Sequence, residues 1–262
     1  MSAGGGNGHP AEEQFIAEMN ALLVRDAEEY YRTLMQEDTI SWNIRDDHFA
    51  RTIVDIVRHF GSMVPNDATQ KDAKVVIWAH NSHTGDARAT DMGKIRGEIN
   101  LGQRCRELFQ TDNVFNIGFL TNRGTVTAAY EWDEAPHLMN LNNPIAQSIE
   151  KLFDETTEGD GFVITHKIID VPDGSTKKVE IDRKLAEFLN RPRLQRFIGV
   201  IYRTVTEIPS HYTRCKVADQ YDAVVHIKVT RGVRPLDPEV AVASVHKETL
   251  KGDMSAMYPF GE

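Results

Sequence analysis

The spacing of apolar side chains changes along the chain and separates helical from extended segments. Apolar residues recur at three- and four-residue steps from Phe15 to Leu34, which predicts a long amphipathic helix after Pro10. The same spacing predicts a second helix from Arg45 to Phe60. Shorter helices are predicted farther along the chain, at 98–109, 144–153 and 185–189.

Short apolar runs predict strands. The run from Val75 to Ala79 has no polar alternation, which suits a strand buried on both faces, as in a parallel sheet. The segments 114–120 and 125–130 flank the turn residues 121–124 and are predicted to form a hairpin. Further strands are predicted at 162–165, 197–202 and 223–229, with a turn at 171–174.

These elements predict an α/β fold, with a mostly parallel sheet, flanking helices and a long N-terminal helical segment. Residues 11–236 are predicted to form one domain. The glycine-rich residues 1–10 are expected to be a flexible arm, and residues 237–262 a loosely structured tail. The arm lacks a basic region followed by an apolar stretch, so it does not resemble a secretory signal.

Charge and cysteine content limit the partners and the compartment. The formal net charge of −9 argues against nucleic-acid binding, which needs a basic surface, and against docking on anionic membranes. No apolar run is long enough to span a bilayer. Only two cysteines occur, Cys105 and Cys215, so a disulfide framework is excluded and we expect a cytoplasmic protein.

Two histidines follow the first predicted strand, and this is the strongest chemical signal in the chain. His80 and His83 lie at the strand's carboxyl end, where ligands bind in open α/β sheets. A neutral imidazole can take a proton from water, donate one or bind a metal. Alternatively, the two rings only cap the strand end. A zinc site would need a further ligand that no tight Cys/His cluster supplies.

Three charged residues near these histidines have both a structural and a functional interpretation. Asp86 and Arg88 could form an ion pair that fixes the loop, or they could bind a polar group of a substrate. Glu98 begins the next predicted helix, where the helix dipole alone favours a carboxylate. It could also orient one of the histidines.

A second polar group follows the predicted strand at 197–202. Tyr202 and Arg203 lie at its carboxyl end, and His211 follows in the next loop. The guanidinium could bind a carboxylate or an anionic intermediate, or only form a surface salt bridge. Because parallel strands end on the same side of a sheet, we expect His80 and His83 to line one cleft near Arg203.

Other nucleophile and phosphate motifs are absent from the sequence. There is no G-x-S-x-G elbow, no Walker loop and no G-x-G-x-x-G. Nothing marks Ser82, which lies between the two histidines, as a nucleophile. If the protein is a hydrolase, water is therefore the expected nucleophile, with histidine as its base.

Several stretches together resemble the erythromycin esterase family. They occur in the family's order and with similar spacing, and they cover roughly residues 20–236, which correspond to the C-terminal portion of the family only. The matching stretches are SWNIRD at 41–46, WAHNSHTGDAR at 78–88, GEINLGQ at 97–103, the segments 117–119 and 124–129, and GVIYR at 199–203 followed by SHY at 210–212.

The resemblance implies an α/β fold and metal-independent hydrolysis of a macrolide lactone ester, with a histidine that activates water. It places His80 and His83 in the active-site cleft, with Glu98, Arg203 and His211 as weaker candidates. The family's Gly-Glu-x-x-His-Gly motif, which holds its proposed general base, is missing from this sequence. We therefore expect a fragment, a shortened gene product or a divergent member, and a poor esterase or none.

The sequence thus predicts a carboxylic-ester hydrolase that acts on a small-molecule ester or lactone and needs no cofactor or metal. The candidate catalytic residues are His80, His83 and Glu98. The candidate substrate-binding residues are Asp86, Arg88, Tyr202, Arg203 and His211. A catalytically dead binding or assembly module is the alternative, and a metal-dependent hydrolase built on the two histidines is a third. A missing segment would also leave a sheet edge unpaired, which invites self-association.

Overall fold

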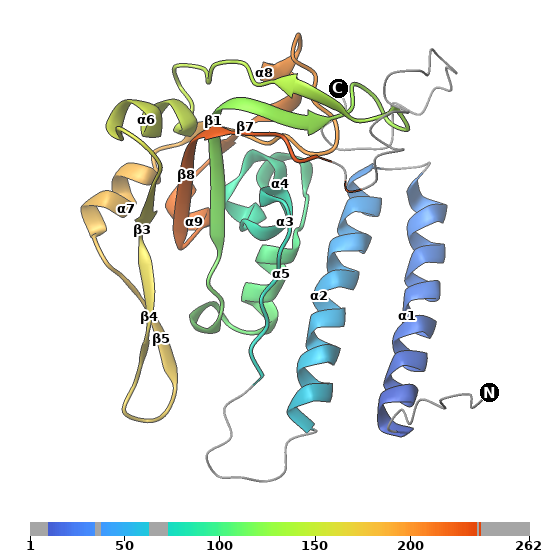
Figure 1. Cartoon of the computed structure of the whole chain (residues 1–262). Coiled ribbons are helices and arrows are strands. Elements are labelled where there is room, and N and C mark those ends of the chain that lie inside the picture. The colour runs from blue at the N-terminus through green and yellow to red at the C-terminus, as the bar shows by residue number, and fades with distance from the viewer. Residues whose placement is uncertain (1–9, 35–37, 63–72, 235, 237–262) are drawn as a thin grey trace, which may run out of the picture.

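The computed structural model describes residues 10–34, 38–62, 73–234 and 236. Two long helices stand beside a sheet that carries several shorter helices (Figure 1). The tail predicted at 237–262 and the predicted arm, apart from Pro10, lie outside the described residues. Within the described part of the chain, no helix is both long enough and apolar enough to cross a bilayer.

The two long helices are α1 (Pro10–Leu34) and α2 (Asp38–Ser62), and they confirm the prediction of a helical N-terminal segment. They pack side by side (Figure 1), and α2 begins at Asp38 rather than near Arg45. At one end of the pair, the rings of Phe15 and His59 stack with their centroids 3.9 Å apart.

The main sheet has the strand order β2-β1-β8-β3. Its strands are β1 (Ile117–Ala128), β2 (His137–Asn140), β3 (Gly161–Ile164) and β8 (Ala223–Thr230). The two central strands, β1 and β8, run parallel, whereas β2 and β3 run antiparallel to their neighbours. The fold is therefore mixed α/β. The prediction of a mostly parallel sheet is wrong, because both outer strands return antiparallel beside the central pair.

The hairpin predicted across 114–130 is also wrong, because β1 continues through the predicted turn. Gly124, one of the predicted turn residues, does adopt a left-handed φ of +116°. Its role is to let the backbone of β8 approach closely, since a Cβ at this position would collide with the carbonyl group of Thr230.

Two apolar runs predicted as strands are not strands in the structure. Residues 73–80 have no β partner among the described residues, and Val76 and Trp78 are 91% and 89% exposed. Residues 197–202 are irregular, apart from a bridge between Ile201 and Ala129. A backbone segment needs a neighbouring strand for its hydrogen bonds, and an apolar sequence alone does not supply that neighbour.

Short helices cover one face of the sheet and build the main core. They are α6 (Ile149–Thr156), α7 (Arg183–Leu189) and α9 (Val217–Gln220). Their apolar side chains pack on Leu120 of β1 and Val224 of β8, and Tyr221 completes the cluster. The covered face thus has the dense apolar packing expected of a domain core.

The remaining elements surround this sheet. β4 (His166–Asp170) and β5 (Thr176–Glu180) form a hairpin around the turn predicted at 171–174, and β6 (Arg193–Arg196) pairs with β7 (Tyr212–Cys215). The other short helices are α3 (Asn81–Thr84), η1 (Ala87–Ala89), α4 (Asp91–Arg96), α5 (Leu101–Leu108), η2 (Thr111–Asn113) and α8 (Glu207–His211).

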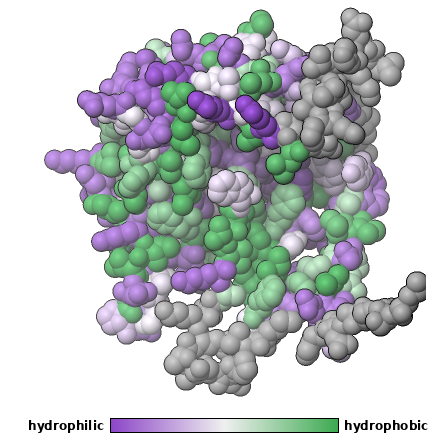
Figure 2. Space-filling view, in the orientation of Figure 1, coloured by the Kyte–Doolittle hydropathy of each residue, from purple (hydrophilic) through white to green (hydrophobic). Residues whose placement is uncertain are grey.

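The other face of the sheet carries exposed apolar side chains. Phe119 and Phe162 are 45% and 71% exposed, and the ring of Trp78 lies 6.2 Å from that of Phe119. Figure 2 shows hydrophobic side chains gathered over the sheet and the segment that precedes α3. Such patches often mark contact surfaces, and the self-association expected from the sequence stays a prediction.

Candidate functional site

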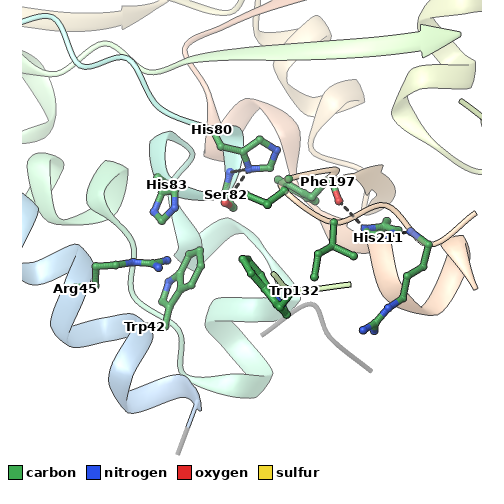
Figure 3. Close-up of a pocket in the computed structure, with 12 residues that line it drawn as sticks. Trp42, Arg45, His80, Ser82, His83, Trp132, Phe197 and His211 are labelled. Carbon is green, nitrogen blue, oxygen red and sulfur yellow. Dashed lines mark hydrogen bonds between the residues drawn. The ribbon is translucent and has the colours of Figure 1, made fainter. Parts of the chain in front are cut away.

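A pocket of about 220 Å³ lies where α2, α3 and the irregular segment 197–203 meet. It brings together His80, His83, Arg203 and His211, four of the site residues predicted from the sequence (Figure 3). The reason for that prediction was wrong, since neither group follows a strand. Instead, the two groups face each other across a pocket with aromatic walls, formed by Trp42, Trp132 and Phe197.

One face of α2 holds the loop before α5 and so fixes this side of the pocket. The indole Nε1 of Trp42 donates to the carbonyl of Ile99 at 3.0 Å. The amide of Asn43 donates to the carbonyl of Gly97 at 3.0 Å and accepts from the backbone N–H of Ile99 at 2.7 Å. These bonds satisfy loop backbone groups and set the position of α2 against the site.

Asp46, one helical turn after Trp42, orients the imidazole of His83. Its carboxylate is fully buried and lies 2.8 and 2.9 Å from Nδ1 of His83, and it also accepts from the backbone N–H of Leu101 at 2.9 Å. Because an ionised carboxylate only accepts hydrogen bonds, Nδ1 of His83 carries the proton. The lone pair of the neutral ring is then on Nε2.

The ring of His83 is held flat against the indole of Trp42. The two centroids are 4.6 Å apart and the planes are tilted by only 9°, with Phe49 edge-on at 6.4 Å. No hydrogen-bond partner for Nε2 occurs among the residues that the structure describes. The arrangement is that of an oriented general base: one nitrogen is fixed by a carboxylate and the other can face a reactant.

His80 has the opposite tautomer. Its Nδ1 accepts from the backbone N–H of Ser82 at 3.3 Å and lies 2.9 Å from the Ser82 hydroxyl, so it caps α3. The proton of the neutral ring is then on Nε2. Burial among the pocket walls, with His83 adding to the effect and the Ile198 carbonyl opposing it, lowers the pKa of His80 to about 4. His80 is therefore a neutral hydrogen-bond donor at pH 7 rather than a base.

His211 lines the pocket but has both ring nitrogens bound to main chain. Nδ1 donates to the carbonyl of Phe197 at 3.1 Å, and Nε2 accepts from the backbone N–H of Arg203 at 2.9 Å. Burial lowers the pKa of His211 and keeps the ring neutral. Its contacts make it the residue that fixes the segment 197–203.

Tyr202 and Arg203, at the end of that segment, have different surroundings. The guanidinium of Arg203 lies in the pocket wall and pairs with the carboxylate of Glu131 at 2.8 Å. Tyr202 is fully buried outside the pocket lining, where its hydroxyl donates to Glu207 at 3.0 Å and accepts from the backbone N–H of Asn142 at 2.9 Å. Burial raises the pKa of Tyr202 to about 12, so its hydroxyl stays protonated.

Asp86 and Arg88 lie outside the pocket lining and form an ion pair. The Asp86 carboxylate is buried, 2.7 Å from Arg88 and 3.1 Å from Arg106. Arg106 also pairs with Asp222 at 3.1 Å and so ties the α3–α5 region to the start of β8. The structural interpretation of this pair is the one that its contacts support.

Glu98 is buried behind the pocket rather than in its wall. Its carboxylate lies 3.1 Å from Nε of Arg96. Burial raises the pKa of Glu98 to about 7, with Arg96 opposing the rise and Asp46 adding to it. Asp46 and not Glu98 contacts His83, so the orienting role considered for Glu98 belongs to a residue on α2.

Several residues of this site have no role assigned from the sequence, among them Trp42, Arg45 and Asp46 on α2. All three come from the stretch SWNIRD, which was matched to a family motif without a chemical role. The helix predicted from the sequence begins at Arg45 and leaves out Trp42, whereas the observed α2 begins at Asp38 and so places Trp42, Arg45 and Asp46, which are three and four residues apart, on one face. Within the described part of the chain, no group of three or more His, Cys, Asp or Glu side chains could hold a metal ion.

Comparisons with known proteins bear on both the fold and the family. A sequence model described as erythromycin esterase matches residues 3–230. The fold is similar to that of a protein from Bacillus cereus, with 14% identity and a TM-score of 0.53, and to that of a succinoglycan biosynthesis protein, with 16% identity and a TM-score of 0.55. Each match covers 77% of this chain and 42% of the other chain, so this chain spans less than half the length of either.

Proposed function

The chain belongs to the erythromycin esterase family, and from this membership we propose that it is a carboxylic-ester hydrolase in which His83, oriented by Asp46, activates water. The observation that carries the proposal is the contact between the buried Asp46 carboxylate and Nδ1 of His83, beside a pocket. The substrate is a small-molecule ester or lactone.

The reaction needs one proton to be moved twice. Nε2 of His83 takes a proton from water while the water oxygen bonds to the ester carbonyl carbon. The Asp46 carboxylate stabilises the imidazolium that forms, as in other carboxylate–histidine pairs. The tetrahedral intermediate then breaks its bond to the alcohol oxygen, which receives the proton from His83. The products are a carboxylic acid and an alcohol, or a hydroxy acid from a lactone.

Other residues of the pocket support this chemistry. His80 is hydrogen-bonded to the backbone of Ile198, so it joins the start of α3 to the segment 197–203 and supports the pocket wall beside His83. The rings of Trp42 and Trp132 form apolar walls that exclude water from the ester. His211 acts only through the loop that it fixes, and Asp86, Arg88 and Tyr202 support the structure around the site.

The test is turnover of 4-nitrophenyl acetate by the purified chain, with His83→Ala as the main variant. Removal of the base should lower kcat/KM by about 10²–10⁴-fold. His59→Ala is the matched control, since His59 packs on α1 away from the pocket. A strong chelator should leave turnover unchanged. Activity that survives in His83→Ala, or that chelation removes and zinc restores, would contradict the proposed mechanism.

A binding module without catalysis is the second candidate. It is favoured by the absence of the Gly-Glu-x-x-His-Gly motif from the given sequence. Ligand binding without turnover of any activated ester, in a chain shown to be folded, would favour this candidate over the hydrolase.

A further inference from the structure

The charge of the pocket wall differs from that of the whole chain. The chain has 39 acidic against 30 basic residues. Among the described residues that line the pocket, none is acidic and two are arginines, Arg45 and Arg203. A cleft lined by charges of one sign concentrates ligands of the opposite sign, even on a protein of opposite net charge.

Arg45 places a guanidinium beside the proposed base. Its Cζ lies 4.8 Å from the centre of the Trp42 ring, against which His83 also stacks. Figure 3 shows the side chain of Arg45 extending from α2 toward Trp42 and His83. A guanidinium supported by an aromatic ring has a fixed orientation, and its planar donors match the two oxygens of a carboxylate.

Arg203 contributes the second guanidinium, from the end of the segment 197–203. Its side chain is 18% exposed, and its backbone N–H is fixed by His211. The ion pair with Glu131 uses the Nη2 group, and Glu131 itself is 50% exposed, outside the pocket lining. The guanidinium has five N–H donors in all, so this ion pair does not exhaust them.

Two histidines of the wall, His80 and His211, add little positive charge at neutral pH. The pKa of His80 lies near 4 and that of His211 is lowered by burial, so both rings are neutral. Asp46 lies behind His83 and accepts hydrogen bonds from that ring and from Leu101, and is therefore not available to a ligand. The arginines thus set the electrostatic character of the pocket surface.

We propose that the pocket selects esters that carry a negatively charged group, such as a carboxylate, on an apolar or aromatic body. This inference rests on the proposed hydrolase function and adds the substrate class to it. The negative group lies against Arg45 or Arg203, and the body packs between Trp42, Trp132 and Phe197. A substrate with a cationic amine is disfavoured at the same position.

The first experiment measures binding and does not depend on turnover. The chain has three tryptophans, and two of them line the pocket, so the variant Trp78→Phe leaves only pocket reporters. Three ligands of similar size and different charge are titrated against its fluorescence: phenylacetate, phenylacetamide and phenethylammonium. We expect phenylacetate to bind at least about tenfold more tightly than either of the others, and less tightly as salt is raised.

Variants then identify the source of the preference. Arg45→Met and Arg203→Met should each reduce the preference for phenylacetate by about fivefold or more, and Arg45→Lys should restore part of it. Glu131→Gln should strengthen phenylacetate binding by a few-fold, because it removes the anion that competes for Arg203. Arg183→Met, on α7 and outside the pocket lining, is the matched control. Circular dichroism confirms that each variant is folded.

A second experiment separates this inference from the proposed function. Turnover of 4-nitrophenyl hydrogen glutarate is compared with that of the uncharged 4-nitrophenyl pentanoate. Preferential hydrolysis of the anionic ester supports both proposals. Hydrolysis without preference keeps the hydrolase and overturns the substrate class, as does equal or absent binding of phenylacetate. Selective phenylacetate binding without turnover of either ester keeps the ligand class and overturns the hydrolase.

Discussion

His83 and His211 line the same pocket, but their rings have different hydrogen-bond partners. Nδ1 of His83 meets the Asp46 carboxylate, and no partner for its Nε2 occurs within the described ranges. In His211, backbone groups of Phe197 and Arg203 occupy both nitrogens. The first imidazole can accept a proton from a reactant, whereas the second would have to break a structural hydrogen bond to do so.

This difference shows that proximity to a pocket does not by itself make a histidine catalytic. A carboxylate partner leaves one nitrogen for chemistry and stabilises the charged ring, whereas two main-chain partners hold the ring neutral and fix a loop. The comparison predicts that substitutions around His83 affect mainly rate, and that substitutions at His211 affect mainly stability.

After the loss of the base itself in His83→Ala, the largest effect is expected from Asp46→Asn. An asparagine can present either an oxygen or an NH₂ group to Nδ1, so it no longer selects the tautomer of His83, and it carries no charge to stabilise the imidazolium. The expected fall in kcat/KM on activated esters is about 10–100-fold. Asp47→Asn is the matched control, because Asp47 pairs with Arg51 and Arg104 instead. Equal activity of the two variants would show that Asp46 does not orient the base.

The next effect concerns the stability of His211→Ala. Loss of the ring leaves the carbonyl of Phe197 and the N–H of Arg203 without their partners, which costs about 2 kcal/mol of unfolding free energy. For a chain of this size the melting temperature should fall by roughly 5 °C. Steady-state kinetics should show kcat within a few-fold of the wild type. A folded, fully stable His211→Ala protein without activity would instead identify His211 as the base.

Much of the fold could be predicted from local spacing. The helical steps from Phe15 to Leu34 gave α1, and the apolar run at 223–229 gave β8. The runs at 75–79 and 197–202 are just as apolar and are not strands. The difference is the presence of a neighbouring strand, a nonlocal property that a run of side chains does not encode. The turn predicted at Gly124 is wrong for a similar reason, since the close approach of β8, and not a turn, requires a glycine at this position.

The site could be predicted only in part, because local sequence patterns identify some of its residues and packing between distant elements supplies the others. The sequence pattern identifies His80 and His83 in one loop and Arg203 in a distant segment, and the pocket contains all three. Asp46 is one of 39 acidic residues, and nothing in its own neighbourhood distinguishes it. Its role comes from the packing of α2 against the loop at 97–101, which places its carboxylate beside a histidine on a different element.

Glu98→Gln tests the carboxylate that lies behind the pair. The pKa of Glu98 is about 7 in the folded chain against 4.5 for a free side chain, so between these values the folded state holds a proton that the unfolded state has lost. The wild type should therefore lose stability as pH rises from 5 to 8. Glutamine does not titrate. The difference in unfolding free energy between the variant and the wild type should therefore be about 2 kcal/mol more in favour of the variant at pH 8 than at pH 5.

Chemical denaturation of both proteins at pH 5 and pH 8 provides this measurement. Activity distinguishes the two roles considered for Glu98. If it only lies behind Asp46, Glu98→Gln should keep kcat/KM within a few-fold of the wild type. A large loss of activity without the pH-dependent gain in stability would restore the orienting role considered from the sequence.

The smallest effect is expected at His80, the third histidine of the pocket, and it sharpens the comparison. Asparagine is a good N-cap, so His80→Asn keeps an acceptor for the backbone N–H of Ser82 and removes only the titrating ring.

The folded ring has a pKa of about 4 against 6.5 for a free imidazole. As pH falls below 6.5, the unfolded state takes up a proton that the folded state resists, so the wild type loses stability down to about pH 4. The pocket walls desolvate the ring, but the residue as a whole is open to solvent in the pocket, so screening should keep this loss below about 1 kcal/mol. Urea unfolding at several pH values between 4 and 7 should show a shallower slope for His80→Asn than for the wild type, with equal stability at pH 7. An unchanged slope would mean that His80 protonates as easily as a free histidine, and it would then share the positive charge now assigned to the arginines.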